Sequence, residues 1–594
     1  MIPPTGPTTD GGNPQHSSEL IVTDYPPEML RRLHDPNVSF EEYPYYARES
    51  RAWENSPANM PTSDKRGIKD LLKKVTGKTE DNGEIILGIS PTDDGPNHAT
   101  GAEKPPLAKV SPHTDNDGIV TPTRTVISNE EWNTAARATR TATWGAMFYL
   151  LTTDIIGPFS VPWAMAQTGY GPGIALYTVF GSFAGYTGWQ LWTMFLDLDS
   201  DRYPLKTYGD VAYRVFGPWA RHCVNVLQSI QILCIVSGVV LSGGQGIAQI
   251  SKNSICYILC IFIFAIAGMI VGQVRTLRRF GWLANFGVFI NLMICFIVMG
   301  VAAHSEPNYA AAAASYSIPK GPVITNAGTP PGTTFVTALN GLNQAVYSYG
   351  GSMMYCEFMS EMRKPMDFWK GLICAQTLIY CCYVTFGAVV YSFQGQFAFN
   401  PAMQGLSPYN WQTAVNIMFL FAGLISACLY SNIGIKVLYI NIFEELFNAP
   451  PLTTRKGKLF WVALVPVYWA VAFVFCSAIP QFSYISGLVG AVCILQFTYT
   501  FPPILMLGFQ VKKDAILPQE IFDPITKSVT RLDSGIKRWS RGFMKNWHIN
   551  SFNIFFALGA ATTAVLGIYS SIISLIAAFD GISVATSFGC TAPV

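Results

Sequence analysis

The sequence predicts an all-α integral membrane protein with about eleven transmembrane helices. Half of its 594 residues are hydrophobic and only 13% are charged, which is too apolar for an ordinary soluble enzyme. Polar residues gather in the first part of the chain, and apolar runs then follow one another. A run of about 20 apolar residues is long enough to cross a bilayer as a helix. The composition therefore indicates a multi-pass membrane protein with a long polar segment before it.

Residues 1–130 are rich in Pro, Gly, Ser, Thr and charge, so we expect a largely disordered tail there. Two pieces of this tail have helical character. Residues 39–55 begin with a Ser suited to an N-cap, and residues 65–78 form a basic amphipathic run suited to anionic lipid. Neither piece is long enough to be stable alone, so a solvated segment is the favoured interpretation of both.

Residues 131–580 form the predicted membrane domain. Its apolar runs span residues 142–168, 174–195, 220–248, 254–274, 280–303, 335–362, 369–393, 411–435, 458–478, 482–509 and 551–578. Tilt accommodates the runs that exceed about 20 residues. An odd number of crossings places the two ends of the chain on opposite sides.

The orientation follows from Lys and Arg in the connections. Basic residues follow the second, fourth, sixth, eighth and tenth runs, whereas the connections 304–334 and 394–410 carry almost none. Because basic loops stay in the cytosol, we expect the tail to be cytosolic and residues 581–594 to form a short extracytosolic C-terminus. Twelve of the thirteen cysteines lie in or at the ends of apolar runs, so we expect small hydrophobes and no disulfides among those within spans.

The first apolar run is interrupted halfway by residues 156–158, Ile-Gly-Pro, which we call the first break. Pro lacks an amide proton, and lipid cannot satisfy the backbone groups that a break exposes. Such backbone must face protein or a water-filled cavity. Pro158 is expected to be the first residue of the outer half-helix, with the amides of Phe159 and Ser160 directed at the gap, a geometry that suits a carboxylate. A plain proline kink is the alternative.

The sixth run carries a second break at residues 348–351, Ser-Tyr-Gly-Gly. Each interrupted run is the first of a set of five predicted spans. This arrangement is typical of a transporter built as a 5+5 inverted repeat. Amides at the first break and carbonyls at residues 346–349 together match an α-amino acid. The residues expected to bind the substrate are Gly157, Pro158, Phe159, Ser160, Tyr347, Ser348, Tyr349 and Gly350.

The third run adds Ser229 and Ile232 to the predicted side-chain pocket, which holds few charges and so favours neutral amino acids.

Three side chains are candidates for coupling transport to an ion. Asp154, one turn before the first break, is suited to a proton or a substrate ammonium, or else pairs with the loosened backbone. Glu357 is expected to pair with backbone or with Arg363, and proton carriage is the alternative. Ser426 would hold a small cation together with carbonyls of the first run, unless it bonds to its own helix. No Lys in the fifth run replaces such a cation.

Motifs of enzymes and ATP-driven pumps are absent from the sequence, which has no Walker loop, no HExxH and no nucleophile elbow. We therefore expect no enzyme activity, no cofactor and no bound metal. No basic stripe with interleaved aromatics indicates nucleic acid. The expected partners are the lipid bilayer, an amino acid, and a coupling ion that is a proton or, alternatively, sodium.

Three segments resemble the amino acid/auxin permease family, particularly its fungal members. They are GPFSVPWAMAQTGYGPG (157–173), TYGDVAYRVFGPWAR (207–221) and YSYGGSMMYCEFMSEMRKPMDFWKG (347–371), and the match extends from residue 132 to the eleventh run. The resemblance implies a leucine-transporter-like fold of eleven spans, substrate binding at residues 157–160 and 347–350, neutral amino acids as a common substrate class and proton coupling.

The function predicted from the sequence is secondary active transport of neutral amino acids by alternating access, driven by protons, at the plasma membrane. Three alternatives remain open at this point: a vacuolar exporter of the same fold, an amino acid sensor without transport, and a sodium-coupled carrier.

Overall fold

The computed structural model describes residues 36–56, 140, 142–274, 277–444, 447, 449–450, 454–479, 482–520, 522–526, 528–580 and 587–592. Within these ranges the fold is helical, with two isolated β-bridges and no strand. The chain divides into two units, Met1–Arg51 with Ala136–Val594, and Ala52–Ala135. The basic run 65–78 lies outside the described residues.

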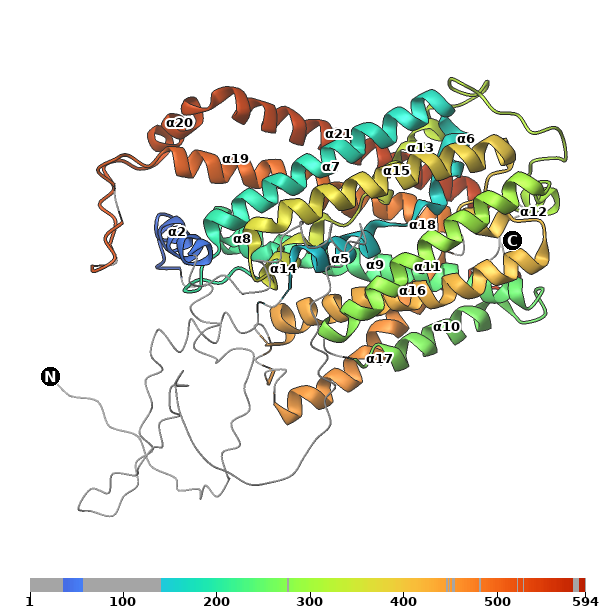
Figure 1. Ribbon diagram of the computed structural model, residues 1–594, viewed down its shortest axis with the longest axis horizontal. Helices are drawn as coiled ribbons and strands as arrows, with labels where there is room; N and C mark the ends of the chain where they lie inside the picture. Colours follow the sequence, from blue (N-terminus) through green and yellow to red (C-terminus); the bar gives the residue numbers. More distant parts are fainter. Residues whose placement is uncertain are drawn as a thin grey trace, which may run out of the picture. The chain divides into compact units, whose positions relative to one another are not determined.

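The apolar runs of the sequence become the long helices of Figure 1. The first run forms α5 (Trp144–Ile155), η3 (Pro158–Ser160) and α6 (Val161–Thr168), and the sixth forms α13 (Phe335–Ser348), η4 (Ser352–Met354) and α14 (Tyr355–Ser360). The other runs form α7 (Tyr170–Leu198), α9 (Pro218–Ile250), α10 (Tyr257–Val271), α11 (Leu277–His304), α15 (Phe368–Gln394), α16 (Tyr409–Leu438), α17 (Arg455–Ala478), α18 (Phe482–Val489) with η9 (Gly490–Ile494), η10 (Gln496–Thr500) and α19 (Phe501–Asp514), and α21 (Trp547–Asp580).

Shorter helices occupy the connections. They are α8 (Tyr208–Phe216), α12 (Tyr309–Tyr316), η5 (Pro365–Asp367), η6 (Gly395–Phe397), η7 (Ala402–Gly405), η8 (Tyr439–Glu444) and α20 (Ile536–Lys545). In Figure 1 the helices α8 and α20 lie at one end of the long helices, and α12 lies at the other.

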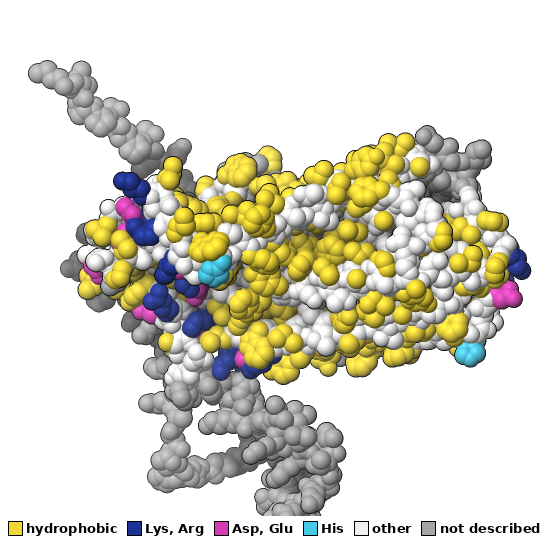
Figure 2. All heavy atoms as spheres, turned by 90° about the horizontal axis from the view of Figure 1, so that it is seen from above, with side chains coloured by type: hydrophobic (Ala, Val, Ile, Leu, Met, Phe, Trp, Pro, Cys, Tyr) yellow, Lys and Arg dark blue, Asp and Glu magenta, His cyan; other side chains and the backbone are white. Residues whose placement is uncertain are grey.

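Among the described residues, seven helices are long and apolar enough to cross a membrane. They are Pro218–Ile250, Asn285–His304, Pro365–Phe397, Tyr409–Leu438, Lys456–Ala478, Ser486–Asp514 and Trp547–Ala577. Figure 2 shows apolar side chains along the flank of the molecule and Lys and Arg gathered near one end. Large apolar side chains such as Leu459 and Phe555 are exposed, as expected of surfaces that contact lipid. The chain is therefore a multi-pass integral membrane protein.

The N-terminal helix α2 (Glu42–Asn55) packs against this domain, so the prediction of a solvated segment is wrong here. Phe40, Tyr43 and Ala47 are buried. Tyr203 donates a 2.6 Å hydrogen bond to Glu42, and Ser50 donates one of 3.2 Å to Asp201. The segment is too short to be stable alone, but contacts with distant parts of the chain supply the stability that local propensity lacks.

A disulfide joins Cys256, just before α10, to Cys590 near the end of the chain. The amide of Tyr257 also donates to the Cys590 carbonyl at 2.9 Å, so the C-terminal segment is held against the start of α10. The expectation that Cys256 acts as a small hydrophobe is thus wrong. Its partner lies 334 positions away, and sequence spacing gives no sign of such a pairing.

Candidate functional site

The first break separates α5 from η3 as the sequence predicts. The helix α5 ends at Ile155, Gly157 precedes η3, and Pro158 is the first residue of η3, where its missing amide removes no helical hydrogen bond. The carbonyl of Ile156 accepts a hydrogen bond of 3.4 Å from the Asn291 side chain on α11. A neighbouring helix therefore supports the break.

The second break separates α13 from η4. Ser348 is the last residue of α13, and Gly350 and Gly351 form a turn before the chain resumes at Ser352. A side chain at Gly350 would have its Cβ only 2.8 Å from Ile494, so the chain requires a residue without a side chain there. The absence of a Cβ lets the interrupted helix pack directly against η9.

The hydroxyl of Tyr383, on α15, joins the two breaks. It lies within hydrogen-bonding distance of the Ile155 carbonyl and 2.7 Å from the Ser348 carbonyl, and the amide of Gly157 donates to it at 3.5 Å. A phenol carries one proton, so it donates to only one of these carbonyls at a time. Tyr383 thus connects both interrupted helices through one group that can change partners.

A second hydroxyl cluster surrounds the Ser348 side chain. Its Oγ donates to the Gln344 carbonyl at 2.8 Å and lies 3.4 Å from both the Ser160 Oγ and the Tyr177 hydroxyl. Tyr349 donates to the Tyr177 carbonyl at 3.0 Å. The cluster is buried, because Ser160, Ser348, Tyr177 and Tyr349 are all less than 9% exposed.

The structure brings most of the predicted binding residues to this junction. Phe159 differs from the others because its side chain lies in an apolar cluster, where its ring packs edge-on against Phe386 and Phe419. Tyr347 is half-buried beside Gly490. Serine hydroxyls and freed backbone groups therefore form the polar part of the candidate site, and Phe159 forms part of its apolar surroundings.

The third-run residues are placed differently. The Ser229 hydroxyl donates to the Asn225 carbonyl of its own helix at 2.8 Å, and Ile232 is buried beside Gly434 of α16. Among the described residues, neither has a hydrogen bond to the two breaks.

Glu357 lies in the first turn of α14 and accepts a 2.8 Å hydrogen bond from Gln228 of α9. The same amide nitrogen donates to the Met353 carbonyl at 3.1 Å. Of the two expected partners, backbone and Arg363, the carboxylate has backbone hydrogen bonds from its own amide and that of Tyr208. In the described part of the chain no ion pair connects it with Arg363. The Glu357 Oε2 atom is buried without a hydrogen-bond partner, as is the Oε1 atom of Gln228.

The other coupling candidates are less defined. Asp154 falls within α5, but its side chain lies outside the described residues. Ser426 is half-buried in α16, and the described residues offer it no hydrogen bond to the first break. Ser426 was expected to hold a cation together with carbonyls of the first run, and two of these, those of Ile155 and Ile156, accept from Tyr383 and Asn291.

Sequence reasoning missed Tyr177, Tyr383 and Gln228. Each lies in an apolar run, where a single tyrosine or glutamine has the pattern of an ordinary core residue. Only the packing of α7, α9 and α15 around the breaks reveals that these side chains contact the interrupted helices. The signal that was available, a polar atom at membrane depth, does not identify its partner.

The two interrupted helices also meet on either side of the hydroxyl cluster. On one side Ala142 exchanges backbone hydrogen bonds of 3.0 and 2.9 Å with Glu361 and Arg363. On the other, α13 approaches α6 so closely that a Cβ at Gly341 would lie 2.7 Å from Thr168. The cluster is therefore enclosed at both ends and is rich in groups that bind ammonium and carboxylate.

Known proteins share this sequence pattern. The sequence model of the family described as transmembrane amino acid transporter protein matches residues 140–529. A transmembrane transporter of Gibberella moniliformis is 24% identical over 392 residues, which cover 64% of this chain and 79% of that protein. The N amino acid transport system protein of Neurospora crassa is 24% identical over 375 residues, 61% of this chain and 75% of that protein. Lysine histidine transporter-like 1 of Arabidopsis thaliana is 22% identical over 402 residues, 64% and 83% respectively.

A multi-pass helical domain with a buried polar cluster between interrupted helices, together with these relatives, defines a transmembrane transporter. The family match covers well over half of the chain, and the chain belongs to the transmembrane amino acid transporter protein family. Amino acid transport is the function of this family.

Proposed function

We propose that this protein is a secondary active transporter of neutral amino acids that works by alternating access and couples transport to protons. The observation that carries the proposal is the position of Tyr383, whose hydroxyl contacts backbone of both breaks. A substrate carboxylate accepts from the Gly157 amide in place of the Tyr383 oxygen, and the substrate ammonium replaces the Tyr383 hydroxyl as donor to the Ser348 carbonyl. Substrate binding then changes the contacts between the two interrupted helices.

The proposed architecture has eleven crossings arranged as a leucine-transporter-like 5+5 inverted repeat. Its support is the pair of interruptions in the first and sixth predicted spans, each at a Gly-containing break. The buried cluster communicates with one side of the membrane when the contact of Ala142 with residues 361–363 opens. It communicates with the other side when the close packing of Gly341 against Thr168 opens.

Proton coupling is assigned to Glu357. Its carboxylate is buried, accepts from the Gln228 side chain and has no basic partner among the described residues, so a negative charge there is costly. The Oε2 atom of Glu357 and the Oε1 atom of Gln228 are both buried without a hydrogen-bond partner. A proton on the Glu357 carboxyl group supplies a donor at this place. Sodium is the alternative coupling ion; two carbonyls of the first run, those of Ile155 and Ile156, already accept from Tyr383 and Asn291.

The proposed orientation places the N-terminal tail in the cytosol and the C-terminus outside. The basic connections support it, and so does the disulfide between Cys256 and Cys590, because disulfides persist in oxidising compartments. The plasma membrane is the proposed location. Residues 1–35 and 57–139 lie outside the described residues, and residues 131–580 are proposed to form the transporter domain.

The proposal is tested by uptake into liposomes that contain the purified protein. Labelled neutral amino acids are compared with lysine and histidine, because the name of the Arabidopsis relative points to basic substrates for that protein. We expect the liposomes to take up neutral amino acids and not to take up lysine. Binding of an amino acid without uptake would identify a sensor. Preferred uptake of lysine would contradict neutral amino acids as the substrate class. Uptake that depends on sodium would identify sodium, and not the proton, as the coupling ion.

A further inference from the structure

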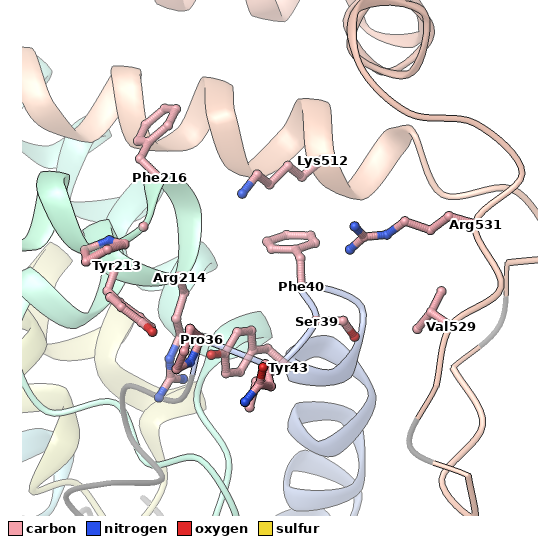
Figure 3. A pocket seen from close by; sticks show the side chains of 14 residues that line it. Pro36, Ser39, Phe40, Tyr43, Tyr213, Arg214, Phe216, Lys512, Val529 and Arg531 are labelled. Atoms are coloured by element: carbon pink, nitrogen blue, oxygen red, sulfur yellow. The ribbon is translucent and has the colours of Figure 1, made fainter. Parts of the chain in front are cut away.

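A cavity of about 640 Å³ lies where the N-terminal segment meets α8, α9 and α19. Figure 3 shows the side chains that line it. Residues before α2, the α8–α9 junction, the end of α19 and the loop after residue 528 all contribute. Its volume lies within the range of about 300–1,000 Å³ that is typical of small-molecule sites.

The lining of this cavity carries an excess of positive charge. Arg214, Lys512 and Arg531 line it, and no Asp or Glu is among its described lining residues. In Figure 3, Lys512 and Arg531 approach the Phe40 ring from different sides. The Lys512 ammonium lies 5.5 Å from the Phe40 ring centroid and forms no ion pair among the described residues. Arg531 pairs with Glu41 at 2.8 Å, yet its side chain remains 47% exposed.

Arg214 supplies the second, independent observation. The residue is only 4% exposed, and its guanidinium donates to the backbone carbonyls of Leu198 and Pro204 rather than to a carboxylate. Its Nε atom is buried with no hydrogen-bond acceptor. A buried guanidinium that has only neutral partners is costly, and an anion in the adjoining cavity lowers that cost.

The position of the cavity indicates where the anion comes from. Phe216 and Pro218 line it at the start of α9, a helix apolar enough to cross a membrane. The neighbouring Trp219 is 80% exposed, as is typical of tryptophans at the level of lipid headgroups. The cavity therefore lies at the depth of lipid phosphates, at the proposed cytosolic end.

We propose that this cavity binds the phosphate-bearing headgroup of an anionic membrane lipid. Lys512 and Arg531 contact the phosphate, and Arg214 provides the buried charge behind it. Because Ser39 and Phe40 form one wall, the bound headgroup also holds the N-terminal segment against the transporter domain. The lipid composition of the membrane thereby controls how firmly α2 is docked.

The test measures binding to the full-length protein in phosphatidylcholine nanodiscs that contain either a phosphatidylinositol phosphate or phosphatidylserine. Soluble inositol hexakisphosphate is the third probe. Lys512→Gln is the main variant, because the Lys512 side chain has no hydrogen bond or ion pair among the described residues, and only its contact with the Phe40 ring is lost. Lys537→Gln removes the same charge from α20, outside the cavity. Hydrogen exchange of residues 42–51 reports the docking of α2.

We expect the phosphorylated lipid to bind more tightly than phosphatidylserine, and Lys512→Gln to weaken its binding about fivefold. Lys537→Gln is expected to leave it unchanged, and bound lipid is expected to slow exchange in α2. Arg531→Gln should weaken binding by a similar factor. Equal binding by Lys512→Gln and the unaltered protein would overturn the proposal. Equal affinity for the soluble phosphate would overturn the assignment to a lipid.

Discussion

The hydroxyl of Tyr383 lies 2.7 Å from the carbonyl of Ser348, the residue at which α13 stops. The same hydroxyl contacts the Ile155 carbonyl, at which α5 stops. Two helix ends that are 193 positions apart therefore share one proton donor, since 348 minus 155 is 193. This group couples the interrupted helices and is the natural first target for mutation.

Tyr383→Phe removes only the shared hydroxyl. It leaves buried carbonyls without their donor, at a cost of about 1–3 kcal/mol, so we expect uptake to fall at least about fivefold. Uptake per amount of purified, monodisperse protein is the measurement. Tyr380→Phe, one turn away on α15, removes an exposed hydroxyl that contacts Thr178 and should change uptake by no more than about twofold. An equal loss of uptake in both variants would contradict a role of the Tyr383 hydroxyl in connecting the two breaks.

Gly181 of α7 permits the close approach of Tyr349. A Cβ at Gly181 would lie 2.8 Å from the Tyr349 hydroxyl, which donates to the Tyr177 carbonyl. Gly181→Ala should therefore displace that tyrosine and destabilise the protein by about 1–3 kcal/mol, measured as a lower Tm in detergent. Gly185→Ala is the matched control, because no atom lies within 4 Å of its Cβ. A Tm for Gly181→Ala as high as that of the control would show that the contact does not matter.

The helical fold and the two breaks were predictable because they depend on local properties. Apolar runs of helical length, Pro158 and the glycines at 350 and 351 act on the backbone wherever the chain is packed. The partners of these breaks were not predictable. Tyr383 and Gln228 act through contacts between helices far apart in the chain, and nothing in the apolar pattern around them gives their direction. The same reason explains the missed docking of α2 and the missed partner of Cys256.

Glu357→Gln tests the assignment of the proton. The amide keeps the size of the side chain but cannot gain or lose a proton, so uptake should persist with little dependence on external pH. Initial rates across a range of pH values are the measurement. Glu306→Gln, an exposed residue in the connection after α11, serves as control and should keep the pH profile of the unaltered protein. An unchanged profile in Glu357→Gln would leave Glu357 as a structural partner of Gln228.

Asp199 anchors α2 through an ion pair of 2.8 Å with Arg51, and a second ion pair of 2.8 Å joins Asp199 to Arg140, just before α5. Burial by itself raises the pKa of this carboxyl, but the two guanidinium groups and the Leu205 amide outweigh burial and lower the pKa from 3.8 to about 2. A lowered pKa in the folded state gives stability that is complete above the ordinary pKa and lost as the pH falls through about 2. Docking of α2 should therefore be constant between about pH 5 and pH 8.

Asp199→Asn should release α2, because it removes the carboxylate that pairs with the buried Arg140 and the half-buried Arg51, at a cost of about 3 kcal/mol or more. Faster hydrogen exchange in residues 42–51 is the expected result. The control Asp197→Asn breaks an exposed pair with Lys513 and should change exchange little. Loss of protection in the unaltered protein between pH 8 and pH 5 would contradict the lowered pKa of Asp199.

The central claim is that this transporter uses a proton gradient to concentrate a neutral amino acid. Its most direct test is uptake of the amino acid identified by the liposome panel, with and without an imposed inward proton gradient, at equal sodium on both sides. The account predicts accumulation above the external concentration that collapses when a protonophore dissipates the gradient, and no accumulation by Glu357→Gln. Accumulation that ignores the proton gradient, or that requires sodium instead, would contradict it.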